Sequence, residues 1–248
     1  MSKAMFPRPA LTRLLPLALG VALLAACGED PEAAKAAAAE QAAANEAAAD
    51  EGAKAFDDAV ARGNWTLAKA QADLLLHDHA GTAAATRVEA QYAEVKAKAE
   101  AGREASRLAA LWSYVATPVT GGQQRSASVY AKDDVDVDGS GPSRVQLIFR
   151  DHPDWGRSSY LVITRGDFDC YGGCRLQVSV DGGPPKSMAG TRPKTDEAIA
   201  MFVDDEKALW RLAKSAKTIE IAFPAKGHGT RKALFEVGGL DPAQLPGW

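Results

Sequence analysis

Residues 103–122 read REASRLAALWSYVATPVTGG, and the character of the chain changes inside this stretch. Helix-forming residues fill it up to Ala110, whereas aromatic and β-branched residues follow from Leu111 and end in a Gly-Gly pair. The composition shifts at the same point: residues 27–110 contain 31 Ala in 84 positions, and residues 111–248 contain 13 in 138. The sequence therefore predicts an α+β protein with a helical amino-terminal region and a β-rich carboxy-terminal domain.

Length and composition exclude several classes of protein. A chain of 248 residues with 46% hydrophobic and 25% charged residues is not collagen-like, wholly disordered or a polytopic membrane protein. Its formal net charge of -3 is too mild and too acidic for a dedicated nucleic-acid binder, so we expect no nucleic-acid partner.

Residues 1–26 have the pattern of a signal peptide. Three basic residues precede an almost continuous apolar run over 14–26, which is shorter than the roughly 20 residues that a membrane-spanning helix needs. The run ends in Leu24-Ala25-Ala26-Cys27, which resembles the lipobox of bacterial lipoproteins. This resemblance implies cleavage before Cys27 and lipidation of Cys27, so that the lipid attaches the chain to a membrane. The alternative is an ordinary secreted protein with a Cys near its cleavage site.

The residue after Cys27 bears on which membrane holds the lipid. In the sorting rule of bacterial lipoproteins, an Asp at this position favours retention in the inner membrane, and here the residue is Gly28. We therefore expect a lipid-anchored protein of the cell envelope, held in the outer membrane and facing the periplasm.

Two further cysteines, Cys170 and Cys174, remain once Cys27 is lipidated. An even pair in an oxidising compartment predicts a disulfide, here at the tip of a β-hairpin. Redox-active dithiols usually have two intervening residues rather than three, and a zinc site would need two more ligands than this pair supplies. We expect no cofactor.

The helical region divides into two parts. Residues 27–52 are mostly Ala, Glu, Gln and Lys, have little apolar bulk to bury and predict a tether, either helical or flexible. Residues 53–110 have apolar side chains at helical spacing and predict a helical hairpin segment. The string Gly63-x-Trp65-x-x-Ala68, followed by Leu74-Leu75 and Gly81-Thr82, resembles a single helix-turn-helix unit of tetratricopeptide type.

Short alternating segments separated by turn residues fill residues 111–248 and predict an antiparallel β-sandwich-like domain or a curled sheet. One helix, over about residues 205–216, interrupts them, with Asp204 as its N-cap. Residues 181–197 predict a long loop. The expected strands are 112–116, 126–131, 145–149, 160–164, 176–180, 199–203, 218–223 and 233–237.

The order of these elements resembles the β-sandwich domain of small exported accessory proteins of the VasI type, which are linked to type VI secretion. The resemblance covers roughly residues 111–241 and implies an accessory subunit built on a β-sandwich. The lipid anchor and the helical region are additions to that family's pattern. The residues behind it are Trp112, Leu147-x-x-Arg150, the Gly-Asp-Phe-Asp turn, the Ala-x-Phe202 strand, Leu212, Ile219-Glu220-Ile221 and Phe235-x-Val237-x-Gly239-Leu240.

One acidic segment has the spacing that opens a calcium loop. Asp134, Asp136 and Asp138 alternate before a Gly, and alternating carboxylates can converge on one hard cation. Val145 stands where such a loop would have its closing Glu. The alternative is an acidic strand end followed by a turn.

Basic residues around the predicted strands form a candidate ligand or partner surface, with solvated charge as the alternative. Its members are Arg150, Arg157, Lys186, Arg192 and Lys194.

Motifs that define an enzyme class are missing from the sequence: it has no nucleophile elbow, phosphate loop, dinucleotide fingerprint or metalloprotease helix motif. We therefore expect a non-enzymatic binding or accessory module with an envelope protein as its partner. One alternative is an envelope hydrolase on cell-wall or polysaccharide material, in which His152 or His228 meets a Ser and an Asp in space. The other is a type VI-like secretion accessory subunit.

Overall fold

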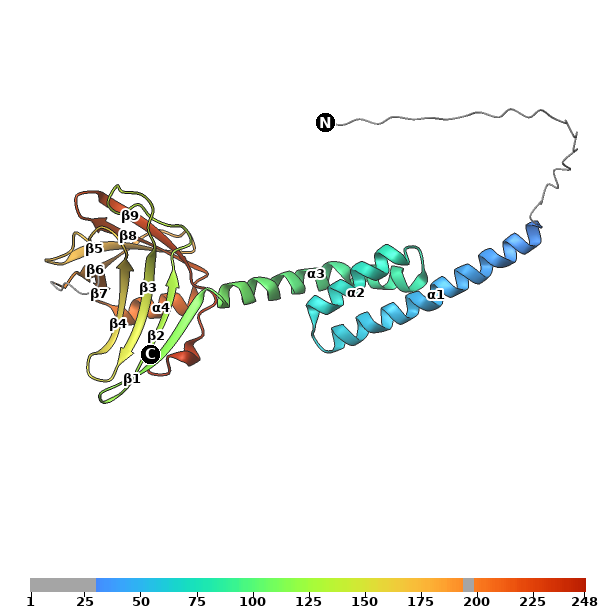
Figure 1. The fold of residues 1–248 in the computed structure, drawn as a ribbon, viewed down its shortest axis with the longest axis horizontal. Coiled ribbons are helices and arrows are strands. Elements are labelled where there is room, and N and C mark those ends of the chain that lie inside the picture. Colours follow the sequence, from blue (N-terminus) through green and yellow to red (C-terminus); the bar gives the residue numbers. More distant parts are fainter. Residues whose placement is uncertain (1–29, 194–198) are drawn as a thin grey trace, which may run out of the picture.

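The computed structural model describes residues 30–193 and 199–248 and confirms the α+β class. Cys27, with the expected signal peptide, and Lys194 lie outside the described residues. Three helices form an arm that leads into a strand-rich domain (Figure 1).

The arm consists of α1 (Pro31–Ala61), α2 (Trp65–Asp78) and α3 (Ala83–Ala109). The side chains of Asp30, Asn64 and Thr82 cap these helices by accepting hydrogen bonds from backbone N–H groups of the first turn. Because α1 runs unbroken through residue 52, the expected tether and the first helix of the expected hairpin segment form one helix.

The three helices pack together only along the middle of the arm. Its core is mostly Ala, with Phe56, Leu75 and Val88 as larger side chains. α1 has no buried residue before Ala49, and α3 has none after Ala99. Asn45 and Glu46 still hydrogen-bond to the α2–α3 turn, so α1 is a single helix only over residues 31–44. At about 1.5 Å per residue, the single-helix ends of α1 and α3 are about 21 Å and about 15 Å long. None of the described helices combines the length and apolar character that crossing a bilayer requires.

The β domain is one antiparallel sheet of nine strands in the order β1-β2-β3-β4-β7-β6-β5-β8-β9. All eight expected strands are present, and β6 is an additional strand inside the expected loop over 181–197. The strands are β1 (Trp112–Val119), β2 (Gly122–Tyr130), β3 (Val145–His152), β4 (Gly156–Ile163), β5 (Cys174–Val180), β6 (Lys186–Thr191), β7 (Ala200–Val203), β8 (Thr218–Ala225) and β9 (Gly229–Glu236).

The sheet is continuous, as in the curled-sheet form of the expectation, rather than two separate sheets. β6 and β7 are joined by only two residue pairs, Gly190 with Val203 and Thr191 with Phe202. The inner faces on both sides of this narrow joint share one hydrophobic core, as the two sheets of a sandwich would. On the far side, the segment after β2 reaches β9, where the Lys132 amide donates to the Leu234 carbonyl at 2.7 Å.

One helix and the carboxy-terminal segment cover part of the inner face. The helix α4 (Glu206–Ser215) is capped by Asp205 rather than by Asp204, because the Asp205 carboxylate accepts from the Ala208 amide. Trp210 on α4 and Trp248 at the chain end both pack against Phe149 of β3, with ring centroids 5.0 and 5.6 Å from that of Phe149. A 3-10 turn, η1 (Pro242–Gln244), precedes the chain end.

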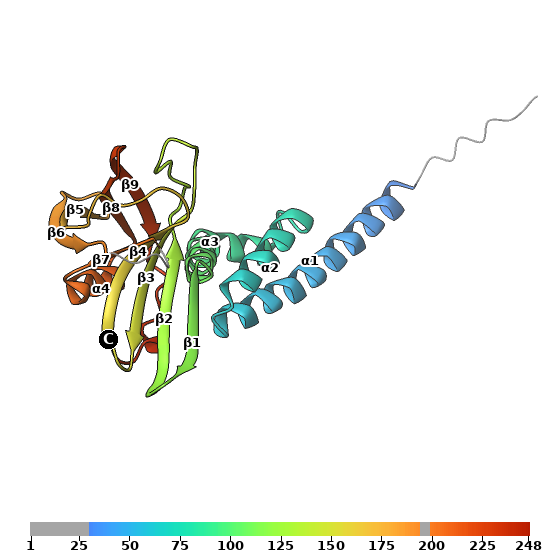
Figure 2. The same ribbon diagram turned by 60° about the vertical axis from the view of Figure 1, so that its left-hand side comes forward.

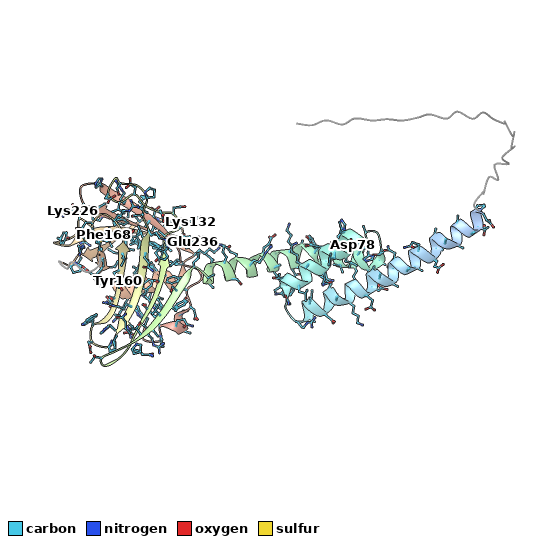
Figure 3. All side chains as sticks on the ribbon, viewed as in Figure 1. Asp78, Lys132, Tyr160, Phe168, Lys226 and Glu236 are labelled. Carbon is cyan, nitrogen blue, oxygen red and sulfur yellow. A yellow bond between two sulfur atoms is a disulfide. The ribbon has the colours of Figure 1, made fainter. Side chains whose placement is uncertain are left out.

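The arm meets the β domain through the last turn of α3. Arg107 pairs there with Glu236 at the end of β9, at 2.7 Å. Gly239 lies so close to the backbone of Leu108 that a Cβ atom would overlap it. Figure 3 shows Glu236 and Lys132 where α3 enters the domain.

We expect Gly239→Ala to lower the free energy of unfolding by about 1–3 kcal/mol, because its methyl group would force Leu108 away. Gly102→Ala is the matched control: Gly102 lies in α3 with no atom near an added Cβ, and Ala is the better helix former by about 1 kcal/mol. Urea denaturation measures both variants. Unchanged stability of Gly239→Ala would contradict the close approach.

Candidate binding surface

The outer face of the sheet presents a row of neighbouring side chains. Strand residues alternate between faces, so Leu147 and Phe149 of β3 point into the core while Ile148 and Arg150 point outward. The register sets Ile148 beside Tyr160 of β4, and Tyr160 beside Phe202 of β7. The Tyr160 and Phe202 ring centroids are 4.9 Å apart. Figure 3 shows Tyr160 on β4.

Arg150 links this row to a tryptophan at the end of the hairpin. Its guanidinium carbon lies 5.3 Å from the ring centroid of Trp155 and 5.4 Å from that of Tyr160. Its Nε donates to the Ser158 hydroxyl at 3.2 Å. A cation between two aromatic faces is attracted to both, so Arg150 holds the two rings in place. We call Arg150, Trp155, Tyr160 and Phe202 the aromatic face.

Trp155 is the most exposed large hydrophobic residue among those described, at 69%. It is nevertheless fixed, because its ring stacks on His152 with centroids 3.9 Å apart and planes 13° from parallel. His152 is buried and its Nδ1 accepts the backbone N–H groups of Asp154 and Trp155, at 3.1 and 3.4 Å. The β3–β4 turn therefore presents a rigid, solvent-facing indole.

Tyr160 stays a neutral phenol under physiological conditions. Burial raises the pKa of its hydroxyl above the usual 10.0, and the nearby charge of Arg150 opposes that rise without cancelling it. The aromatic face therefore has one positive charge, on Arg150, and a hydroxyl that can donate a hydrogen bond.

His152 has a structural role in this geometry. With Nδ1 accepting, the proton of the neutral imidazole is on Nε2, which leaves no free acceptor nitrogen for a general base. His228 lies instead against Gly139, where an added Cβ would be 3.1 Å from its Cε1. Within 30–193 and 199–248, neither His hydrogen-bonds to a Ser or Asp side chain.

Arg157 lies in a depression beside the aromatic face, since His152 and Gly156 of the β3–β4 turn also line it, whereas Lys186 lies in a different groove. Arg157 lines a shallow depression of about 440 Å³ with Asp151, Glu206 and Lys207. Lys186 lines a groove of about 430 Å³ between β6 and α4, where Met188 and Leu212 are the larger apolar residues. Of the four predicted surface residues that the structure describes, only Arg150 contacts the rings of the aromatic face.

Arg192 does not belong to an exposed surface: it is only 5% exposed. Its Nε donates to Asp167 at 2.9 Å, and Asp167 also accepts from the Tyr171 hydroxyl at 2.7 Å. Lys226 approaches Asp167 at 3.9 Å. Figure 3 shows Lys226 near Phe168, at the end of the domain opposite the β3–β4 turn. The prediction of Arg192 as a ligand-binding residue overlooked this ion pair.

Cys170 and Cys174 form the expected disulfide, with Cα atoms 4.9 Å apart. The bond closes a loop before β5 rather than a hairpin tip, because the residues before Cys170 are not in a paired strand of the sheet. The Cys170 carbonyl accepts from the Arg192 amide at 2.9 Å. The disulfide and the Asp167–Arg192 pair thus brace the same loop.

The acidic segment is a turn that satisfies its own carboxylates. Asp136 accepts from the amides of Gly139 and Gly141, and Asp138 accepts from the amide and hydroxyl of Ser140. No three His, Cys, Asp or Glu side chains in the described part of the chain are grouped to hold a metal ion. The carboxylates of Asp136 and Asp138 are therefore in Asx-type turns.

Comparison with known proteins finds no matching family model, no matching curated protein and no matching solved structure. Support for a candidate binding surface therefore comes only from the geometry of these residues. The sequence analysis singled out Arg150 but not Tyr160 or Phe202. Alternation in β4 was the available signal, since it sends Tyr160 and Val162 to the face opposite Leu161 and Ile163.

We expect Asp167→Asn to lower the free energy of unfolding near neutral pH by about 1–3 kcal/mol, because the buried Arg192 guanidinium loses its carboxylate. Burial alone would raise the pKa of Asp167, but hydrogen bonds from Tyr171 and Arg192 hold it below its usual 3.8. A lowered carboxyl pKa stabilises the fold above that pH, and the contribution is lost as pH falls below 3.8.

The stability difference between Asp167→Asn and the unchanged chain should therefore shrink as the pH falls below 3.8. Urea denaturation over a pH series measures it, with the exposed Asp133→Asn as a control of equal charge change. A difference that is constant with pH, or equal in both variants, would rule out the ion pair as its source.

Millimolar Ca²⁺ is expected to leave the melting temperature unchanged, because the Asp136 and Asp138 carboxylates are already occupied by the turn. Mg²⁺ at equal ionic strength controls for screening. A rise in melting temperature that is specific to Ca²⁺ would contradict this expectation and support a calcium site in the acidic segment.

Proposed function

We propose that this chain is a lipid-anchored protein of the cell envelope that acts as a non-enzymatic binding module. Its anchor is the lipobox resemblance at Leu24–Cys27, and its binding element is the aromatic face of the β domain. The observation behind the proposal is Trp155, which is highly exposed and yet held in one orientation by His152 and Arg150.

Exposure and rigidity together favour binding. An exposed indole keeps a large apolar area in water, and burying it under a partner releases that free energy. Because Trp155 is already fixed, association loses little side-chain entropy. Trp, Tyr and Arg are also the residues enriched at the energetic centres of protein interfaces, and this surface combines all three.

The chemistry of the face favours an envelope protein as the partner. Arg150 offers a cation to a carboxylate or carbonyl, while Trp155, Tyr160 and Phe202 offer apolar contact. The arm contributes distance: α3 alone spans about 40 Å, so it separates the β domain from an anchor at the amino terminus. Such a module reaches a partner beyond the membrane surface.

The test is crosslinking of the full-length lipidated protein in intact envelopes, followed by affinity purification. Trp155→Ala should reduce recovery of the partner at least tenfold. Leu74→Ala, which removes another exposed apolar side chain (57%) from α2, should not. Cys27→Ala should release the protein from the membrane fraction and reduce recovery too.

Two results would contradict the proposal. Equal recovery with Trp155→Ala and Leu74→Ala would exclude the aromatic face as the binding site. A Cys27→Ala variant that stays in the membrane fraction would exclude the lipid anchor. For each variant, a circular dichroism spectrum first shows that the protein is folded.

A further inference from the structure

The two edges of the sheet differ in how they are protected. β9 is one edge, and it has the charged residues Arg231, Lys232 and Glu236. The chain after β2 also covers it: Lys132 donates to the Leu234 carbonyl, and Arg231 binds the Asp136 carbonyl. Charge and coverage of this kind keep strand edges from pairing with other chains.

β1 is the other edge, and it has neither protection. Its sequence, WSYVATPV, contains no charged residue, and Val115–Pro118 are all exposed, with Val115 at 52%. In the described chain, the backbone of β1 makes no hydrogen bond outside its ladder with β2. Figure 2 shows β1 at the limit of the sheet, next to β2. An edge this long and uncharged is a template for another strand.

The turn between β1 and β2 identifies the free backbone groups. Val119 pairs with Gly122 across a two-residue turn, so Val119, Thr117 and Val115 bond to β2. The alternate residues, Tyr114 and Ala116, direct their N–H and C=O groups outward. Pro118 fits this pattern, because a proline in a strand is tolerated where its nitrogen faces away from the ladder.

We propose that β1 binds an extended segment of a partner polypeptide, which adds to the sheet as a tenth strand. Outward C=O groups repeat along Tyr114, Ala116 and Pro118, and outward N–H groups along Tyr114 and Ala116. An extended backbone has the complementary groups at the same spacing. Since Val115–Pro118 offer no charge, the segment that fits is uncharged and rich in β-branched residues.

A second copy of β1 is a poorer occupant than a foreign segment. Antiparallel pairing of two copies about Ala116 would set Pro118 of each opposite Tyr114 of the other. Pro118 has no N–H to donate, so each Tyr114 carbonyl would lose its bond. A proline-free segment loses only the one bond opposite Pro118, whereas self-pairing loses two. One strand, β2, lies between this edge and Arg150 of the aromatic face, so variants at each site test the two proposals separately.

The test uses the full-length lipidated protein in intact envelopes, with a photoreactive phenylalanine analogue at Thr117 or, as a control, at Leu74. Mass spectrometry then locates the crosslinked residue. We expect crosslinks from Thr117 to one short uncharged segment of another protein. Ala116→Pro, which removes only an outward N–H, should reduce them at least tenfold, and Ala116→Val, which keeps it, should not. Trp155→Ala should leave the Thr117 crosslinks unchanged, which distinguishes this site from the aromatic face.

Val115→Lys is a second variant, for the case in which Ala116→Pro disturbs folding. It places a charge on the edge and should reduce the crosslinks as well. A synthetic peptide of the crosslinked segment should slow hydrogen exchange of the Ala116 amide at least tenfold. Crosslinks from Thr117 to β1 of a second copy, crosslinks that survive both variants, or no crosslinks would each overturn the proposal.

Discussion

Two residue pairs between β6 and β7 hold the halves of the sheet together, and the rest of the domain depends on this joint. Gly190 lets β6 and β7 approach closely, because a Cβ atom there would lie 3.1 Å from the Phe202 carbonyl oxygen. Around the joint the sheet curls until the inner faces share one core and the chain after β2 reaches β9. A sheet curled in this way covers one of its edges and leaves β1 open.

Arginine is used in two opposite ways in this domain. Arg192 is buried against Asp167 and Tyr171, where it braces the disulfide loop. Arg150 lies between the rings of Trp155 and Tyr160 on the outer face and fixes their positions. Stability and recognition are therefore separated in space: paired charge at one end of the sheet, and a rigid, partly exposed aromatic surface at the other.

Alternation and turn residues predicted eight strands correctly, and the two-residue burial period is clearest in β3 and β4. It missed β6, because Lys-Ser-Met-Ala-Gly-Thr has no such period and pairs through contacts with β5 and β7. The burial of Arg192 was invisible for a similar reason, since its partner Asp167 is 25 residues away. The Asp spacing left two interpretations open, because caps of tight turns and calcium ligands share one pattern, and the hydrogen bonds of Asp136 and Asp138 are those of a turn.

The connection from α3 to β1 has mechanical consequences. Only Ala110 and Leu111 separate the last residue of α3 from the first residue of β1, so the arm continues directly into the edge strand. Tension on the amino terminus therefore enters the domain along β1. It acts along the strand axis and strains many β1–β2 hydrogen bonds at once, in shear. Trp112, at the start of β1, belongs to the hydrophobic core, and Arg107 of α3 pairs with Glu236 of β9, so part of the load also reaches the core and β9. The elements that first bear a pull on the arm are therefore β1 and the end of β9, where α3 enters the domain.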